Sequence, residues 1–153
     1  MRRFTFICYL AVFFLLGCKE QPKHSTWNCL QTAQVSEDIT ATQNSIIVYS
    51  TPQSATSSGT VTIENSKLKL SSVLHSELTF SRTDSGNKME MTLLSADLNI
   101  VKDELDLLSD GRARALLPEI GGTISGEIIH QKDGFRRVKY DDGATLECTS
   151  VDV

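Results

Sequence analysis

The chemistry-bearing residues of the sequence form few combinations that could serve an enzyme. Ser85 and Lys88 have the three-residue spacing with which a lysine can activate a serine nucleophile on one turn of a helix. Gly86 and Asn87 lie between them, however, and indicate a turn between two strands. The glycine-rich segment 121–126 lacks the spacing that presents a serine on a sharp turn after a strand. We therefore expect a non-enzymatic protein.

The carboxylates and histidines also form no convincing metal site. One segment carries four acidic residues close together: Asp103, Glu104, Asp106 and Asp110. Calcium requires six or more converging oxygens, and the ligand order of a calcium-binding loop is absent from this segment. The three histidines are widely spaced: His24, His75 and His130. We interpret the acidic cluster as a solvated hairpin and expect neither a metal nor another cofactor.

The segment 109–122 is the most suggestive candidate for a binding surface. Its candidate contact residues are Arg112, Arg114, Leu116 and Leu117. Arginine beside apolar side chains is typical of protein interfaces, so we predict a partner-binding loop here. The alternative is that Leu116, Leu117 and Ile120 fold back and plug the end of the domain. The sequence leaves both open and favours the plug.

The N-terminus has the three zones of a secretory signal. Arg2 and Arg3 precede a mainly apolar run, residues 4–16, which would span about 20 Å as a helix. That length is well short of the ~30 Å hydrocarbon core of a membrane. No A-x-A-like cleavage site follows the run, which argues against an ordinary secretory signal.

The end of this run carries a family resemblance. Leu15-Leu16-Gly17-Cys18 resembles the lipobox of bacterial prolipoproteins, in which a type II signal peptide is removed and the cysteine is lipidated. The resemblance covers residues 1–18 and implies diacylglycerol and palmitate on Cys18. Several acyl chains hold a protein firmly on a membrane, where one chain does not. In Gram-negative lipoproteins an Asp after the cysteine marks retention in the inner membrane, so Lys19 implies the outer membrane, facing the periplasm.

The remaining charge and cysteines fit an exported domain. The formal net charge of the chain is −4 and becomes −6 without Arg2 and Arg3, which gives no electrostatic footprint for nucleic acid. Without Cys8 and the lipidated Cys18, two cysteines remain, Cys29 and Cys148. Export to an oxidising compartment predicts a disulfide between them, with two free thiols as the alternative.

Hydrophobic residues alternate with polar ones over most of the chain, a pattern typical of strands with one buried face. Short runs with this period are centred on Ile63, Leu68 to Leu70, Leu78 to Phe80, Met89 to Leu93, Leu98 to Ile100 and Leu105 to Leu107. Asp133-Gly134 and Asp142-Gly143 predict tight turns between strands over 123–131, 135–140 and 144–151. Residues 50–58 are expected to form a loop, and residues 31–45 give no clear pattern. Residues 97–117 could be helical, but Gly111 and Pro118 favour strands.

We therefore expect an all-β domain: a small antiparallel barrel or sandwich of about eight or nine strands. Its hairpins resemble those of lipocalin-like envelope domains, which favours a barrel. The expected organisation is a signal peptide over 1–17, a lipidated tether over 18–26 and the β-domain over 27–153. As leading function we expect binding of an envelope or secreted protein, as an inhibitor, an immunity protein or an assembly factor. The alternative is a periplasmic carrier of a small apolar ligand or lipid.

Overall fold

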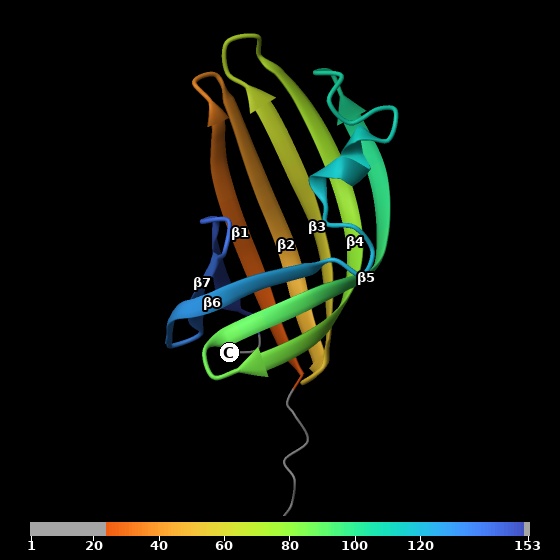
Figure 1. The fold of residues 1–153 in the computed structure, drawn as a ribbon. Helices are drawn as coiled ribbons and strands as arrows, with labels where there is room; N and C mark the ends of the chain where they lie inside the picture. The colour runs from red at the N-terminus through yellow and green to blue at the C-terminus, as the bar shows by residue number, and fades with distance from the viewer. Residues whose placement is uncertain (1–23, 152–153) are drawn as a thin grey trace, which may run out of the picture.

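The computed structural model describes residues 24–151, which form one closed barrel (Figure 1). Its strands are β1 (Ser25–Ser36), β2 (Ile39–Thr51), β3 (Ser54–Asn65), β4 (Leu70–Ser85), β5 (Lys88–Asp103), β6 (Thr123–Lys132), β7 (Phe135–Tyr140) and β8 (Thr145–Ser150). Each strand pairs antiparallel with the next, and β8 pairs with β1, which closes the sheet. The predicted small antiparallel barrel is confirmed, with eight strands in the described part of the chain.

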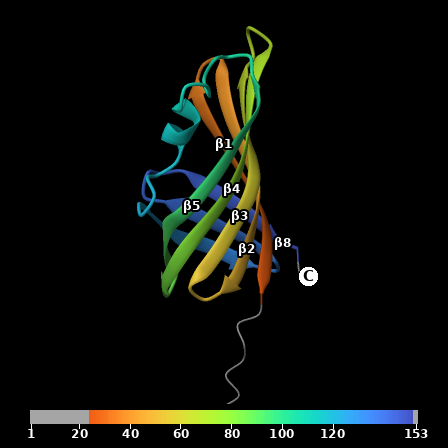
Figure 2. The same ribbon diagram turned by 90° about the vertical axis from the view of Figure 1, so that its right-hand side faces the viewer.

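The two halves of the barrel are closed differently. β1 to β5 have 12 to 16 residues, whereas β6 to β8 have 6 to 10. β6 pairs with only the first five residues of β5, and β8 pairs with β1 only from Trp27 to Leu30. Beyond these points β1 to β5 continue as a curved sheet. The segment after β5, with the short 3₁₀ helix η1 (Arg112–Leu116), lies above β6 to β8 in both views (Figures 1 and 2).

The short hairpins follow from their turn residues. Asp133 and Gly134 both adopt positive φ, 49° and 75°, between β6 and β7. Such angles suit Asp and Gly and produce the tight turn that matches the twist of the two strands. The hairpins predicted at Asp133-Gly134 and Asp142-Gly143 are therefore confirmed, within one or two residues at each strand end.

Several regions differ from the predicted strands and loops. At two of them a polar side chain hydrogen-bonds to the backbone and turns the chain out of the sheet. Residues 105–107 are not a strand: the Asp103 carboxylate accepts the N–H groups of Leu107 and Leu108, so the chain turns away from the sheet. Leu68 lies in the turn of residues 66–69, where the Asn65 side chain accepts its N–H. Residues 54–58, which were expected to lie in a loop, belong to β3. Residues 31–45, which gave no clear pattern, belong to β1 and β2 except for the turn at residues 37 and 38.

A disulfide joins the first and last strands. Cys29 and Cys148 are directly opposite each other on β1 and β8, and both are buried. They are 119 residues apart, and in the chain-entropy model closing such a loop stabilises the fold by about 5 kcal/mol. The predicted bond is confirmed, and it fastens the barrel where β8 returns to β1.

The buried apolar residues form two clusters. The lower cluster fills the end closed by all eight strands and includes Trp27, Phe80 and Val138. The upper cluster lies between the long strands and the segment after β5, and includes Leu74 and Leu108. Along residues 24–151, no helix is long and apolar enough to cross a membrane. The two clusters leave space between them, and that space is the candidate site.

Candidate functional site

The interior of the barrel contains two adjoining cavities. The lower cavity has a volume of about 160 Å³ and the upper one about 440 Å³. Four residues line both cavities, so the two meet there: Gln43, Leu78, Leu116 and Leu117. Protein sites for small ligands usually measure about 300–1,000 Å³, and the upper cavity lies within that range.

The upper cavity is lined almost entirely by apolar side chains from β1 to β4 and from the segment after β5. These are Val35, Ile39, Ala41, Val61, Ile63, Leu74, Leu78, Leu107, Leu116 and Leu117. Val35 is 64% exposed, Leu107 38% and Leu116 53%, so solvent reaches the cavity beside these three residues. We call this opening the mouth.

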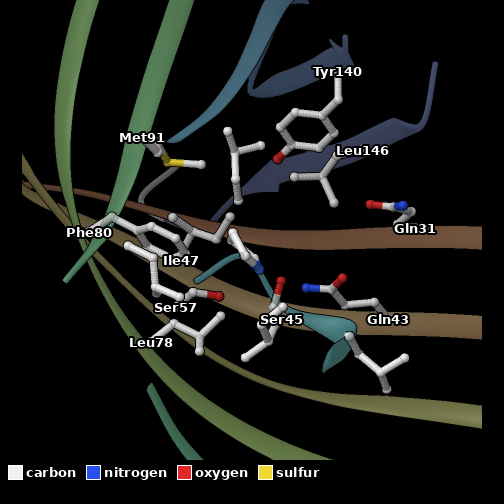
Figure 3. A pocket seen from close by; sticks show the side chains of 15 residues that line it. Gln31, Gln43, Ser45, Ile47, Ser57, Leu78, Phe80, Met91, Tyr140 and Leu146 are labelled. Atoms are coloured by element: carbon white, nitrogen blue, oxygen red, sulfur yellow. The ribbon is translucent and has the colours of Figure 1, made fainter. Parts of the chain in front are cut away.

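Five polar side chains cross the barrel between the two apolar clusters. They are Gln31, Gln43, Ser45, Ser57 and Ser76, and we call them the polar belt. They come from adjacent strands: Gln31 pairs with Gln43, and Gly59 pairs with both Ser45 and Ser76. Figure 3 shows Gln31, Gln43, Ser45 and Ser57 around the lower cavity. Strand alternation directs them inward with Ile47 and Leu78.

The belt has unused hydrogen-bonding capacity. The Ser45 side chain is only 2% exposed, and its hydroxyl has no hydrogen-bond partner among residues 24–151. An unpaired buried hydroxyl costs about 1–3 kcal/mol, so a polar group brought into the cavity would recover part of that cost.

Gly59 keeps this part of the belt free of a larger side chain. A Cβ atom on Gly59 would lie 2.6 Å from both the carbonyl oxygen of Asn44 and the Cβ of Ser45. β3 therefore approaches β2 too closely here for any other residue. A glycine inside a strand often marks such a close approach.

Tyr140 forms part of the wall opposite the belt. It extends from the end of β7 toward the lower cavity (Figure 3). Burial raises the pKa of its hydroxyl above the ordinary value, with a further contribution from the neighbouring Tyr49. The hydroxyl therefore stays protonated at physiological pH and is available as a hydrogen-bond donor.

Neither cavity is lined by a charged residue of the described chain. Arg136, the buried cation next to the lower cluster, lies outside both cavity linings. Its Nη2 donates to the Tyr49 hydroxyl at 2.6 Å, and its guanidinium carbon lies 4.2 Å from the centre of the Trp27 ring. The cavities are therefore apolar with a neutral polar centre.

The predicted partner-binding loop forms one wall of the cavities. Leu116 and Leu117 line both of them, and Leu117 packs against the lower cluster. Arg114 donates to the carbonyl of Pro118 at 2.7 Å, while Ile120 is 57% exposed. Leu116 and Leu117 thus fold back over the interior, as the plug interpretation predicted, whereas Ile120 does not.

Acidic residues hold this loop in place. Asp103 accepts hydrogen bonds from the segment after β5, and Asp106 accepts from Arg112 at 2.8 Å. Asp110 lies 4.0 Å from the same guanidinium. Among residues 24–151, no cluster of three or more possible ligands is arranged around a metal position.

The other predicted sites are placed as follows. Ser85 and Lys88 are paired residues at the hairpin between β4 and β5, so the turn interpretation is confirmed. Cys18 lies outside the described residues, and its lipidation remains a prediction.

One cluster on the outer face of β3 and β4 resembles a catalytic triad in composition only. Glu77 accepts a hydrogen bond from Ser58 at 2.6 Å and lies 3.0 Å from the Nε2 of His75. These contacts lower the pKa of Glu77, with Ser58 contributing most. The serine proton points to the carboxylate, whereas nucleophilic catalysis needs the serine beside the histidine.

The polar belt was missed by sequence reasoning. Gln31 shares strand parity with Cys29, and Ser45 shares it with Ile47, so both face inward. That parity was readable only once residues 31–45 had been recognised as strand.

No protein-family model matches the chain, and no curated protein is similar to it in sequence.

Proposed function

We propose that this protein binds a small, mainly apolar ligand inside its barrel and serves as a carrier in the cell envelope. The observation that supports the proposal is the upper cavity of about 440 Å³, which has apolar walls, a solvent-exposed mouth and no charged lining residue. Protein cores are normally packed with few voids larger than a water molecule. A space of this size is therefore better explained as a binding site than as imperfect packing.

The chemistry of the walls favours an apolar ligand. Transfer of each CH₂ group from water to such a surface contributes roughly 0.8 kcal/mol. The mouth beside Val35, Leu107 and Leu116 gives an entry route that requires no strand to separate. A carrier of an apolar ligand was the alternative function from the sequence, and because of the cavity we now propose it as the leading function.

The test is binding of N-phenyl-1-naphthylamine, a neutral probe whose fluorescence rises in apolar surroundings. We expect saturable binding to the folded protein. Ala41→Phe should abolish it, because Ala41 lines the upper cavity and a phenyl ring would fill the space. Thr42→Phe is the matched control, since the neighbouring residue of a strand points to the opposite face.

Two results would contradict the proposal. One is the absence of saturable binding to the folded wild-type protein. The other is equal binding by Ala41→Phe and Thr42→Phe variants that melt like the wild type, because the probe would then occupy another surface.

We also propose that Cys18 carries the lipid anchor and holds the domain on the outer membrane, facing the periplasm. β1 begins at Ser25, and Val35 at the mouth follows ten residues later, roughly 33 Å along the strand. An anchor before Ser25 therefore attaches to the end of β1 remote from the mouth. Metabolic labelling with a fatty-acid analogue should mark the wild type and not Cys18→Ala; equal labelling would refute the anchor.

Protein binding through the loop of residues 109–122 is the second candidate function. It is favoured by the exposure of Leu116 and Ile120 in the same loop as the half-exposed Arg112 side chain. Crosslinking in intact envelopes should capture one stoichiometric protein partner. Arg112→Ala combined with Arg114→Ala should lose that partner while the barrel stays folded; unchanged capture would remove this surface.

A further inference from the structure

The two ends of the interior space differ in polarity, which suggests the shape of the ligand. The upper cavity is apolar, apart from Gln43 and Ser76 at the polar belt. The lower cavity brings together Gln31, Gln43, Ser45, Ser57 and Tyr140. A molecule that occupies both cavities would place an apolar part toward the mouth and a polar part against the belt.

We propose that the ligand is an amphipath with one alkyl or acyl chain and an uncharged, hydrogen-bonding head, such as an alcohol or an amide. This inference rests on the proposed function and specifies the ligand class for the same site. The head lies against Gln43 and Ser45, and the chain runs along the upper cavity toward Ile39 and Val35.

The belt offers donors and acceptors for such a head. The amides of Gln31 and Gln43 each provide both kinds of group, and no hydrogen bond to either amide is found within residues 24–151. The buried hydroxyl of Ser45 is also without a partner in the described chain. The protonated Tyr140 hydroxyl faces the same space (Figure 3). These groups match a head that both donates and accepts.

The absence of charge from the lining excludes ionised heads. A buried charge without a partner is far more costly than a buried neutral polar group. The guanidinium of Arg136 lines neither cavity: its Nη2 donates to Tyr49 and the group stacks on Trp27, while its buried Nε has no hydrogen-bond partner among residues 24–151. A carboxylate or ammonium at the belt would therefore lose its hydration without gaining an ion pair.

The dimensions fit a single chain. From Gln43 to Ile39 the cavity follows β2 for four residues, roughly 13 Å. Its volume of about 440 Å³ lies toward the lower end of the range for small-molecule sites. One chain fills such a groove, whereas a molecule with two chains needs a larger space.

The experiment is competition with bound N-phenyl-1-naphthylamine at pH 8 by 1-dodecanol, dodecanoate and dodecylammonium. The three have the same chain and differ in the charge of the head. We expect 1-dodecanol to bind at least about tenfold more tightly than either ion, because only the ions lose hydration without compensation.

Two variants test the belt itself. Gln43→Leu and Ser45→Ala should each weaken 1-dodecanol binding about two- to tenfold, which is the contribution of one hydrogen bond. The circular dichroism spectra of the same variants should match the spectrum of the wild type, which shows that they fold. Gln131→Leu on β6 is the matched control for the first, because Gln131 is exposed and lines neither cavity.

The outcomes separate this inference from the proposed function. If the naphthylamine probe does not bind, the proposed function fails and the inference fails with it. If the probe binds but dodecanoate or dodecylammonium competes as well as 1-dodecanol, the inference is wrong and the proposed function stands. If Gln43→Leu and Ser45→Ala bind 1-dodecanol like the wild type, the belt does not recognise the head.

Discussion

The carboxylate of Asp103 accepts five hydrogen bonds where β5 ends. The donors are the backbone N–H groups of Leu107, Leu108 and Ser109 and the hydroxyls of Ser72 and Ser109. These contacts hold the pKa of Asp103 well below its ordinary value, with the Ser72 hydroxyl contributing most. One side chain thus satisfies several backbone donors that would otherwise need a strand partner.

We predict that Asp103→Asn loosens the loop after β5. An amide nitrogen replaces one acceptor oxygen, so some of the N–H groups of Leu107, Leu108 and Ser109 lose their partner. Hydrogen exchange of these amides should accelerate, while exchange in β7 stays unchanged. Asp110→Asn is the control, because the Asp110 carboxylate lies 4.0 Å from the Arg112 guanidinium and accepts no backbone hydrogen bond within residues 24–151. Equal exchange in both variants would contradict this role for Asp103.

Acid should have a related effect on the wild type. The lowered pKa means that ionised Asp103 stabilises the fold above the carboxyl value of the unfolded chain, about 3.9. That stabilisation decreases as the pH falls below this value and disappears once the pH passes the lower pKa of the folded state. The three loop amides should therefore exchange faster at pH 2 than the intrinsic acid dependence of exchange predicts.

The segment between β5 and β6 has separate anchoring and lining residues. Leu108 and Ala113 are buried in the upper cluster and fix the segment to the sheet. Leu116, at the end of η1, is 53% exposed and lines both cavities. Leu108 and Ala113 therefore anchor the segment, whereas Leu116 borders the cavities.

We predict that Leu108→Ala lowers the free energy of unfolding by about 2–5 kcal/mol, the usual cost of truncating a buried leucine. Leu116→Ala should change it by less than about 0.5 kcal/mol, because the side chain is half exposed. Urea unfolding followed through the single tryptophan, Trp27, measures both variants. A larger loss for Leu116→Ala than for Leu108→Ala would show that the loop is anchored by another residue.

Strands were predicted accurately where a local turn motif marks their ends, and less accurately elsewhere. The last three strands are bounded by Asp-Gly turns, a local signal, and they were predicted closely. β5 continues through two register shifts against β4, at Leu94 and Val101, which interrupt its alternation. In β4 the alternation is continuous, but the inward positions 72 and 76 are serines. Both strands were therefore read as several short runs.

The candidate site was harder to predict than the strands, because it consists of polar residues on the inward face, where a sequence pattern leads one to expect apolar residues. Gln31, Gln43 and Ser45 lie at inward positions, where polar residues hide the alternation that identifies a strand. Leu116 and Leu117 were recognised because apolar residues beside arginines stand out in a loop. Their contact with the cavity depends on the fold of Asp103 and Leu108, which no local pattern reveals.

The whole molecule combines a stable end with an open one. Eight strands, the lower cluster and the Cys29–Cys148 bond close one end. At the other end five long strands and the loop after β5 surround the upper cavity. Under the proposed function, ligand entry would need only the loop and the mouth to adjust, with the lower end as a fixed support.

The most direct test of this account is the site at which 1-dodecanol binds, mapped by amide chemical shifts of the ¹⁵N-labelled domain. The account predicts saturable shifts at Gln43, at the neighbouring inward residues of β1 to β4 and at residues 105–118. The amides of residues 135–137 and of the turn at Asp133 should stay unchanged, since these residues line neither cavity. Shifts confined to the outer faces of the strands, or no saturable shifts, would contradict an interior ligand site.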